Sequence, residues 1–360
     1  MKDKAMTIDA SVGKRISMLR TLLILLIVFL HTGGPSLEEL DYSNYQEVIR
    51  FAFQDLLGRL GVPTLTVISG YLLFSSKLDL TPLKMYKKKF MTLAIPFFFF
   101  NVLYFAVQYG LEYFTGIAPL YALVEKPAYR LVNYLVSYNG MPLNEALHFL
   151  RDMMVLVFLT PLFSFFLRRF PVVGFILVMA IFMNNLDHTV INRNTMAILF
   201  YVGGWAATSK FDMTKFDQYG KHALALLVLV GVMVMYFRVQ DYTYVYLVAP
   251  FTVWPATVLL VNTKVGNWLA ANSKYSFFLF LAHTPLLRVL DLLNHKFLDG
   301  NATLVFVVGS FFIVVPTLVI AYDLAVKYMP NVFCFMIGGR SEKKSRKVTG
   351  GNQLVAKTTV

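Results

Sequence analysis

The sequence predicts an all-α integral membrane protein, a bundle of about ten transmembrane helices with both termini in the cytoplasm. Three observations support this prediction. Of the 360 residues, 57% are hydrophobic and 15% are charged, and the mean hydropathy of +0.61 is far above that of a soluble domain. Apolar runs of spanning length follow one another along almost the whole chain. Lysine and arginine gather in every second connection between these runs.

Ten apolar segments are candidates for crossing the membrane, because about 17–25 apolar residues are needed to cover the hydrocarbon of a bilayer. The first follows Lys14 and Arg15, as the apolar part of a signal peptide would. No small-residue cleavage site comes after it, so we expect a retained helix. The fifth and sixth segments are short. The segments cover residues 16–33, 52–75, 90–110, 146–167, 171–185, 195–208, 222–237, 242–261, 275–293 and 301–326.

The formal charge of +13 follows from the enrichment of basic residues on the cytoplasmic side of membrane proteins, and we predict no nucleic-acid partner. Most of the 33 lysines and arginines lie in the two terminal tails and in alternate connections. We therefore expect a cytoplasmic tail over residues 1–15, a transmembrane domain over 16–326 and a basic, partly disordered cytoplasmic tail over 327–360. The basic residues assigned to the outside are Arg50, Lys126, Arg130, Arg193, Arg238 and Lys296.

The chain has one cysteine, Cys334, which excludes an intramolecular disulfide and a cysteine-based metal cluster. We predict no metal site. The lipid bilayer is the expected partner, and the oligomeric state is left open.

Arginines remain inside four of the predicted spans, where a charge is costly and points by default to a functional site. The alternative is a local ion pair. It is available to Arg59, which follows Asp55 by four positions on the same helix. The arginines within the spans are Arg20, Arg59, Arg151 and Arg288.

A local ion pair is also available to Arg288, because Asp291 follows it by three positions. Arg151 is different, since its acidic neighbour Asp152 is the next residue and adjacent helical residues point to different faces. We therefore expect Arg151 to find its partner on another element.

The first predicted span carries Arg20 near its cytoplasmic end and His31 near its outer end. Eleven positions at 3.6 residues per turn bring the two side chains to nearly the same helix face, about 16 Å apart along the axis. Such a stripe suits an anionic carrier whose reactive end reaches the imidazole. In the alternative interpretation, Arg20 extends to the lipid headgroups and His31 is an interfacial polar residue.

The segment from Arg20 to His31 also has the spacing R-x10-H that opens membrane acyltransferase family 3, and the chain resembles this family of bacterial proteins that acylate envelope glycans. The resemblance continues through Arg59, Val62 and Pro63 to Ser69, Gly70 and Tyr71. It includes Lys87, Lys88 and Lys89 before Pro96, the sequence L-H-F-L-R-D over 147–152, and the aromatic segment 277–285 with His283.

Two positions depart from the family pattern. His148 stands where a tryptophan is expected, and residues 64–66 replace a more aromatic run. Both departures suggest a difference in acceptor, because neither changes the pair of Arg20 and His31.

The resemblance implies an enzyme of the bacterial cytoplasmic membrane. It would take an acyl group, most simply acetyl, from cytoplasmic acyl-CoA and transfer it to a hydroxyl of an envelope polysaccharide, glycolipid or related acceptor. His31 would act as the general base or carry the acyl group transiently. Arg59 or Arg151 would stabilise the oxyanion. The implied catalytic residues are His31, Arg59, Arg151 and Asp152.

The resemblance also implies two groups of binding residues. Ser69 and Gly70 have a second interpretation, because small residues equally allow two helices to pack closely. The implied residues for the donor are Arg20, Ser69, Gly70, Tyr71, Lys88 and Lys89, and those for the acceptor are His148, His283 and Arg288.

Two other classes of protein fit the same intramembrane charges. In a transporter, for example a flippase of lipid-linked glycans, the charges would line a substrate path. In a membrane scaffold or sensor, they would tolerate neutralisation one at a time.

Overall fold

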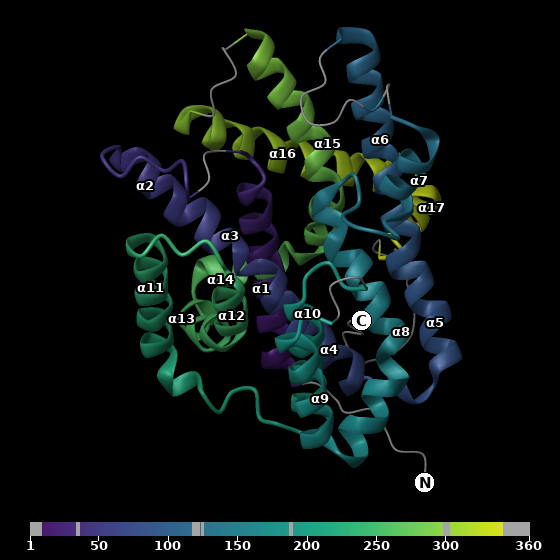
Figure 1. Ribbon diagram of the computed structural model, residues 1–360, viewed down its shortest axis with the longest axis vertical. Helices are drawn as coiled ribbons and strands as arrows, with labels where there is room; N and C mark the ends of the chain where they lie inside the picture. Colours follow the sequence, from purple (N-terminus) through teal and green to yellow (C-terminus); the bar gives the residue numbers. More distant parts are fainter. Residues whose placement is uncertain are drawn as a thin grey trace, which may run out of the picture.

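The computed structural model describes residues 9–33, 37–116, 123, 126–186, 190–297 and 303–340, and the regular elements within these ranges are all helices (Figure 1). This confirms the predicted all-α class. The α-helices are α1 (Ala10–Leu30), α2 (Tyr45–Phe51), α3 (Leu57–Arg59), α4 (Gly61–Ser75), α5 (Pro82–Lys89), α6 (Ile95–Thr115), α7 (Ala128–Val136), α8 (His148–Arg169), α9 (Pro171–Met183), α10 (Thr195–Thr208), α11 (Gly220–Tyr236), α12 (Thr243–Ala256), α13 (Val258–Val261), α14 (Lys264–Ala271), α15 (Ser273–Phe297), α16 (Leu304–Tyr328) and α17 (Pro330–Met336).

Short π and 3-10 segments join or interrupt these helices. Two of the short segments are π-helical and join neighbouring helices into longer continuous ones. One links α2 to α3, and the other links α5 to α6. The short segments are η1 (Ala52–Leu56), η2 (Leu78–Leu80), η3 (Phe90–Ala94), η4 (Glu145–Leu147) and η5 (Asp217–Tyr219).

Six helical stretches in the described ranges are long and apolar enough to cross a membrane. The helices α9 and α10 are also apolar but shorter. Helix α1 is not among the six stretches, because it carries the three basic residues Lys14, Arg15 and Arg20. Each predicted segment contains helix, but the number of spans and the side of the termini stay predictions. The six stretches are Tyr45–Ser75, Pro82–Thr115, Glu145–Arg169, Asp217–Tyr236, Ser273–Phe297 and Leu304–Tyr328.

Helix α1 runs through the middle of the molecule and organises the bundle (Figure 1). It contacts α14, α15 and α16 as well as α3 and α4. Its apolar side chains are correspondingly buried, with Leu19 and Val28 fully inaccessible. The stripe that runs from Arg20 to His31 therefore lies inside the protein.

Glycines set the spacing between α4 and α10, which share the most extensive contact in the bundle. A methyl group added at Gly70 would collide with the carbonyl oxygen of Phe200, and one at Gly203 would collide with that of Val67. This close approach accounts for Gly70 without a ligand. The Ser69 hydroxyl donates to the carbonyl of Leu65 at 2.7 Å within the same helix.

We expect Gly203→Ala to lower the stability of the protein, because the added methyl forces two backbones apart. Overpacking of this kind typically costs about 1–3 kcal/mol. Thermal unfolding of the purified protein in detergent measures the effect. The matched control is Gly309→Ala on α16, where an added methyl meets nothing within 4 Å. Equal unfolding temperatures for the two variants would contradict the packing role.

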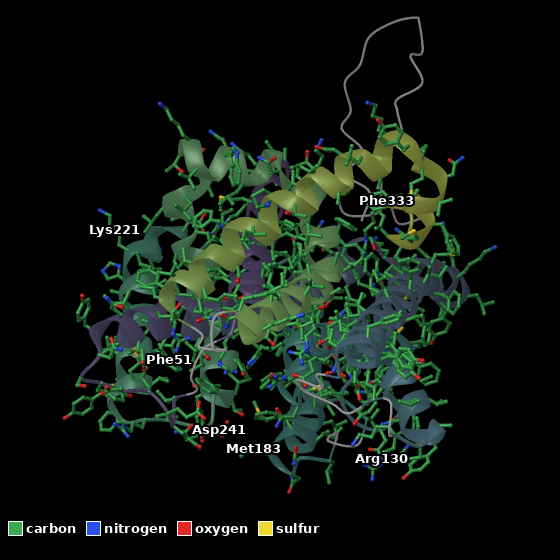
Figure 2. The ribbon with its side chains drawn as sticks, turned by 90° about the horizontal axis from the view of Figure 1, so that it is seen from above. Phe51, Arg130, Met183, Lys221, Asp241 and Phe333 are labelled. Atoms are coloured by element: carbon green, nitrogen blue, oxygen red, sulfur yellow. The ribbon has the colours of Figure 1, made fainter. Side chains whose placement is uncertain are left out.

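The described end of the chain is packed against the bundle. Phe333 of α17 lies 5.2 Å, between ring centres, from both Phe278 and Tyr322 (Figure 2). Gly338, at φ +71°, fits against the backbone of η3 so tightly that an added methyl would come within 2.8 Å of Thr92 Cα. The tail that we predicted to be disordered begins at Gly338, and its residues 341–360 lie outside the described ranges.

Candidate active site

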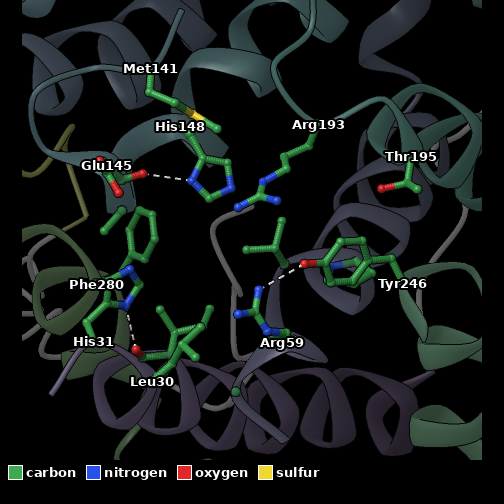
Figure 3. Close-up of a pocket in the computed structure, with 15 residues that line it drawn as sticks. Leu30, His31, Arg59, Met141, Glu145, His148, Arg193, Thr195, Tyr246 and Phe280 are labelled. Atoms are coloured by element: carbon green, nitrogen blue, oxygen red, sulfur yellow. Dashed lines mark hydrogen bonds between the residues drawn. The ribbon is translucent and has the colours of Figure 1, made fainter. Parts of the chain in front are cut away.

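A polar cavity lies beyond the last turn of α1. His31 directly follows that helix and faces side chains from α3, η4, α8 and α12 and from the segment before α10 (Figure 3). The structure thus brings together residues that are far apart in the sequence. Its polar lining includes His31, Arg59, Glu145, His148, Arg193 and Tyr246.

The hydrogen bond of His31 determines where its ring can accept a proton. Nδ1 lies 2.8 Å from the carbonyl oxygen of Ile27. Because a carbonyl oxygen only accepts hydrogen bonds, this contact assigns the proton of the neutral ring to Nδ1. Nε2 then keeps its lone pair, so His31 can take a proton from a substrate at that atom.

His283 packs against His31, with ring centres 5.1 Å apart and planes inclined by 65°. It is fully buried, and its Nδ1 lies 3.0 Å from the carbonyl oxygen of Leu279. It does not line the cavity described above. This placement suits a residue that holds the His31 ring, and the implied acceptor contact stays a prediction.

His148 lines the cavity opposite His31 (Figure 3). Its Nδ1 lies 2.7 Å from the carbonyl oxygen of Glu145, which orients the ring through the same kind of contact. The Glu145 carboxylate lies close enough to act electrostatically on His31. We did not single out Glu145 from the sequence, although it stands only two positions before the family-like 147–152 segment.

Arg59 has several contacts in the structure and also lines the cavity. It forms the predicted ion pair with Asp55, and its guanidinium stacks 4.2 Å from the centre of the Tyr242 ring. Nη1 also donates to the Tyr246 hydroxyl at 3.3 Å. Because Arg59 still lines the cavity, its positive charge remains near the His31 ring.

The structure corrects the expectation that Arg151 does not pair with its neighbour Asp152, while the expected partners on other elements are present. Its Nη1 lies 3.0 Å from Oδ1 of the adjacent Asp152, because the long side chain bends round to the neighbouring carboxylate. Arg151 also donates to the carbonyl oxygens of Ser137, at 3.1 Å, and Val190. Asp152 has no exposed surface and accepts the backbone N–H groups of Asn192 and Arg193, each at 3.0 Å.

The pair of Arg151 and Asp152 therefore anchors the segment that carries Arg193. Neither member lines the cavity, whereas Arg193 points into it between His148 and Arg59 (Figure 3). From the sequence, Arg193 was only one of the basic residues assigned to the outside. Its position identifies it as a candidate site residue, and Arg151 and Asp152 act on the site through it.

Two further cavities adjoin the first. One shares Arg59, Arg193 and Tyr246 with it and is lined mainly by polar groups of the segments 191–194 and 240–243. The other shares His31 and Glu145 with it and contains Arg288, which forms its predicted ion pair with Asp291 at 2.7 Å. His31 thus lies at the junction of two polar cavities.

A second group of charges surrounds Arg20, midway along α1. The positive charges of Arg20, Lys88 and Arg340 all act on Lys89, so the four basic groups lie close together. Among the described residues, neither Arg20 nor Lys89 forms an ion pair. Arg340 stacks 3.5 Å from the centre of the Phe277 ring and joins this cation cluster from beyond the predicted spans.

Tyr71, which the resemblance assigns to the donor, is only 4% exposed. Gly70 lies on the packed face between α4 and α10. The donor contact of Ser69, Gly70 and Tyr71 stays a prediction.

Comparison with known proteins gives one family and one relative. The family described as "Acyltransferase domain" matches residues 14–325. The succinoglycan biosynthesis protein ExoH of Rhizobium meliloti (strain 1021) is 27% identical over 354 residues, which cover 93% of this chain and 95% of the relative. No solved structure matches the chain.

Proposed function

The chain belongs to membrane acyltransferase family 3, and on this basis we propose that it moves an acyl group, most simply acetyl, from cytoplasmic acyl-CoA to a hydroxyl of an envelope glycan. Membership favours an acyltransferase over the transporter and the scaffold. The relative is named for the biosynthesis of a polysaccharide, which supports a polysaccharide or glycolipid acceptor. We place the protein in the bacterial cytoplasmic membrane, with both termini inside.

The observation that carries the proposal is the arrangement around His31. Its Nδ1 is held by the carbonyl of Ile27, and its ring faces a cavity that also contains Arg59 and Arg193. Nε2 accepts the proton of the acceptor hydroxyl as the hydroxyl oxygen bonds to the carbonyl carbon of the thioester. The two guanidinium groups stabilise the negative charge that develops on the thioester oxygen.

The second half of the reaction returns the proton. As the carbon–sulfur bond breaks, His31 gives its Nε2 proton to the departing thiolate, and the products are the ester and free coenzyme A. A transient acyl group on Nε2 would divide the same reaction into two transfers. Both routes require Nε2 to be free, which the contact between Nδ1 and Ile27 supports.

The cation cluster of Arg20, Lys88, Lys89 and Arg340 supports a site for the coenzyme's phosphates. Arg20 lies midway along α1, about 16 Å from His31 for an α-helical rise over eleven residues. The pantetheine arm would follow α1 between the two groups. The phosphate charge thereby stays at one end while the thioester reaches the imidazole.

Mass analysis of envelope glycans tests the proposal directly. Cells that lack the protein should lose an acyl mass from one glycan, and the wild-type gene should restore it. The mass difference identifies the acyl group and the fragment identifies the acceptor. Identical glycans with and without the protein, under conditions where it is inserted in the membrane, would contradict the proposal.

Arg20→Ala is expected to raise the KM for acyl-CoA about tenfold to a hundredfold, because a hydrogen bond to a charged group contributes about 1.5–3 kcal/mol. The rate at saturating donor should change much less. Donor titrations in membranes containing the variant measure both quantities. Lys84→Ala is the matched control, since Lys84 is exposed on α5. An unchanged KM for Arg20→Ala would exclude its role in donor binding.

A further inference from the structure

Arg288 is a buried arginine whose hydrogen-bonding capacity is only partly used. The residue is 7% exposed, and Nη1 donates to Oδ2 of Asp291 at 2.7 Å. Nε and Nη2 are also buried, and neither finds a partner in the protein. A buried polar group left unsatisfied typically costs about 1–3 kcal/mol, and more when it is charged. A ligand that accepts hydrogen bonds from the two free nitrogens would remove this cost.

The two free nitrogens have a defined geometry. Nε and Nη2 form one edge of the planar guanidinium, and this edge matches the two oxygens of a carboxylate or a phosphate. Asp291 occupies a different nitrogen, so it leaves the edge available. Glu145 lines the same cavity, and Nε and Nη2 of Arg288 have no hydrogen-bond partner among the described residues.

Arg288 is one of the residues that line a cavity next to the candidate catalytic residue. Arg288 and His31 both line it, together with the hydroxyl-bearing side chains of Tyr104, Thr284 and Ser310. Its charged lining residues are Arg288, Asp291 and Glu145, so Arg288 is its only cation among the described residues. An anionic group bound there would be part of a substrate that reacts at His31.

We propose that the cavity lined by His31 and Arg288 binds a carboxylate carried by one of the two substrates. The free edge of Arg288, formed by Nε and Nη2, recognises this carboxylate. The inference rests on the proposed acyl transfer. A carboxylate at this place has two sources. It is either the distal carboxylate of a dicarboxylic acyl group on the donor or the carboxylate of an acidic sugar in the acceptor.

The experiment has one arm for each source and uses full-length protein in native membranes. In the donor arm, succinyl-CoA is compared with butyryl-CoA, which has the same chain length without the distal carboxylate. In the acceptor arm, the native glycan is compared with the same glycan after chemical reduction of its carboxyl groups. Each comparison gives a ratio of kcat/KM for the anionic member over the neutral member.

The wild type should favour the anionic member by about tenfold to a hundredfold in one arm, the factor that corresponds to a charge-assisted hydrogen bond. Arg288→Met should reduce this ratio to about one, through a loss that falls mainly on the anionic member. The apolar side chain suits the burial, and Asp291 is 35% exposed and remains hydrated. Arg288→Lys keeps the charge without the planar edge and should give an intermediate ratio.

Arg50→Met is the matched control, because Arg50 is equally buried but lines none of the three cavities. It should leave the ratio at the wild-type value. Equal activities toward both members of each pair in the wild type would mean that the free edge binds water only, and would overturn the inference. So would a preference that survives Arg288→Met, or an equal loss on both members in a folded variant. If the wild type transfers no acyl group from any donor, the proposed function itself fails.

Discussion

His31→Ala is expected to lower the rate of acyl transfer by about a hundredfold to ten-thousandfold, the usual contribution of a positioned general base. The loss should appear in the rate at saturating donor and acceptor, because the proposed role of His31 is in the reaction itself, and Arg20, the proposed donor contact, lies about 16 Å away along α1. Acyl transfer in membranes of known protein content measures the rate.

A histidine outside the cavities provides the matched control for this variant. His222 lies exposed on α11, away from the cavities, and His222→Ala should transfer acyl groups like the wild type. Near-normal transfer by a membrane-inserted His31→Ala variant would remove His31 from the mechanism. Intact mass measurement with donor and without acceptor distinguishes the two routes, because only the covalent route leaves an acyl adduct on the wild type.

Asp152→Ala is expected to destabilise the protein by about 3–5 kcal/mol, the typical cost of breaking a buried ion pair from one side. The substitution leaves the buried Arg151 guanidinium without its carboxylate and removes the acceptor of two backbone N–H groups. The 190–193 segment should detach, and acyl transfer should fall because Arg193 leaves the cavity. Thermal unfolding and protease sensitivity of this segment measure the effect.

Two comparisons separate the anchoring role from a direct one. Arg193→Met should reduce acyl transfer with little loss of stability, because the backbone contacts to Asp152 remain. Asp212→Ala should affect neither property, since the Asp212 carboxylate only receives exposed hydrogen bonds from Thr214. Unchanged stability of Asp152→Ala would show that the buried pair does not hold the segment.

The structure shows which element positions each group of the candidate site. The first helix places Arg20 and His31 on one stripe, so a single element sets the distance between these two groups. The buried pair on α8 supplies Arg193 indirectly through the loop that it holds. Helix α15 supplies both His283 and Arg288, one against the His31 ring and one in the adjoining cavity.

Local sequence patterns predicted the helices and the parts of the site that lie on a single helix. Apolar runs of spanning length indicated the helices, because hydropathy and length act within each segment. The helical period placed Arg20 and His31 on one stripe. It also indicated the ion pairs of Arg59 with Asp55 and of Arg288 with Asp291, both of which the structure contains. Each of these inferences depends on residues within three turns of one helix.

Only the tertiary structure decided which groups meet around the stripe. Glu145 comes from the short 3-10 segment η4, Arg193 from a connection and Arg340 from the residues that follow α17, where no helical period predicts a direction. The pair of Arg151 and Asp152 was missed because helix geometry fixes the Cβ directions and leaves a long guanidinium free to bend. The sequence by itself thus determined the helices and the axis of the site. The packing of distant segments, which no local pattern encodes, decided its charges and its cavities.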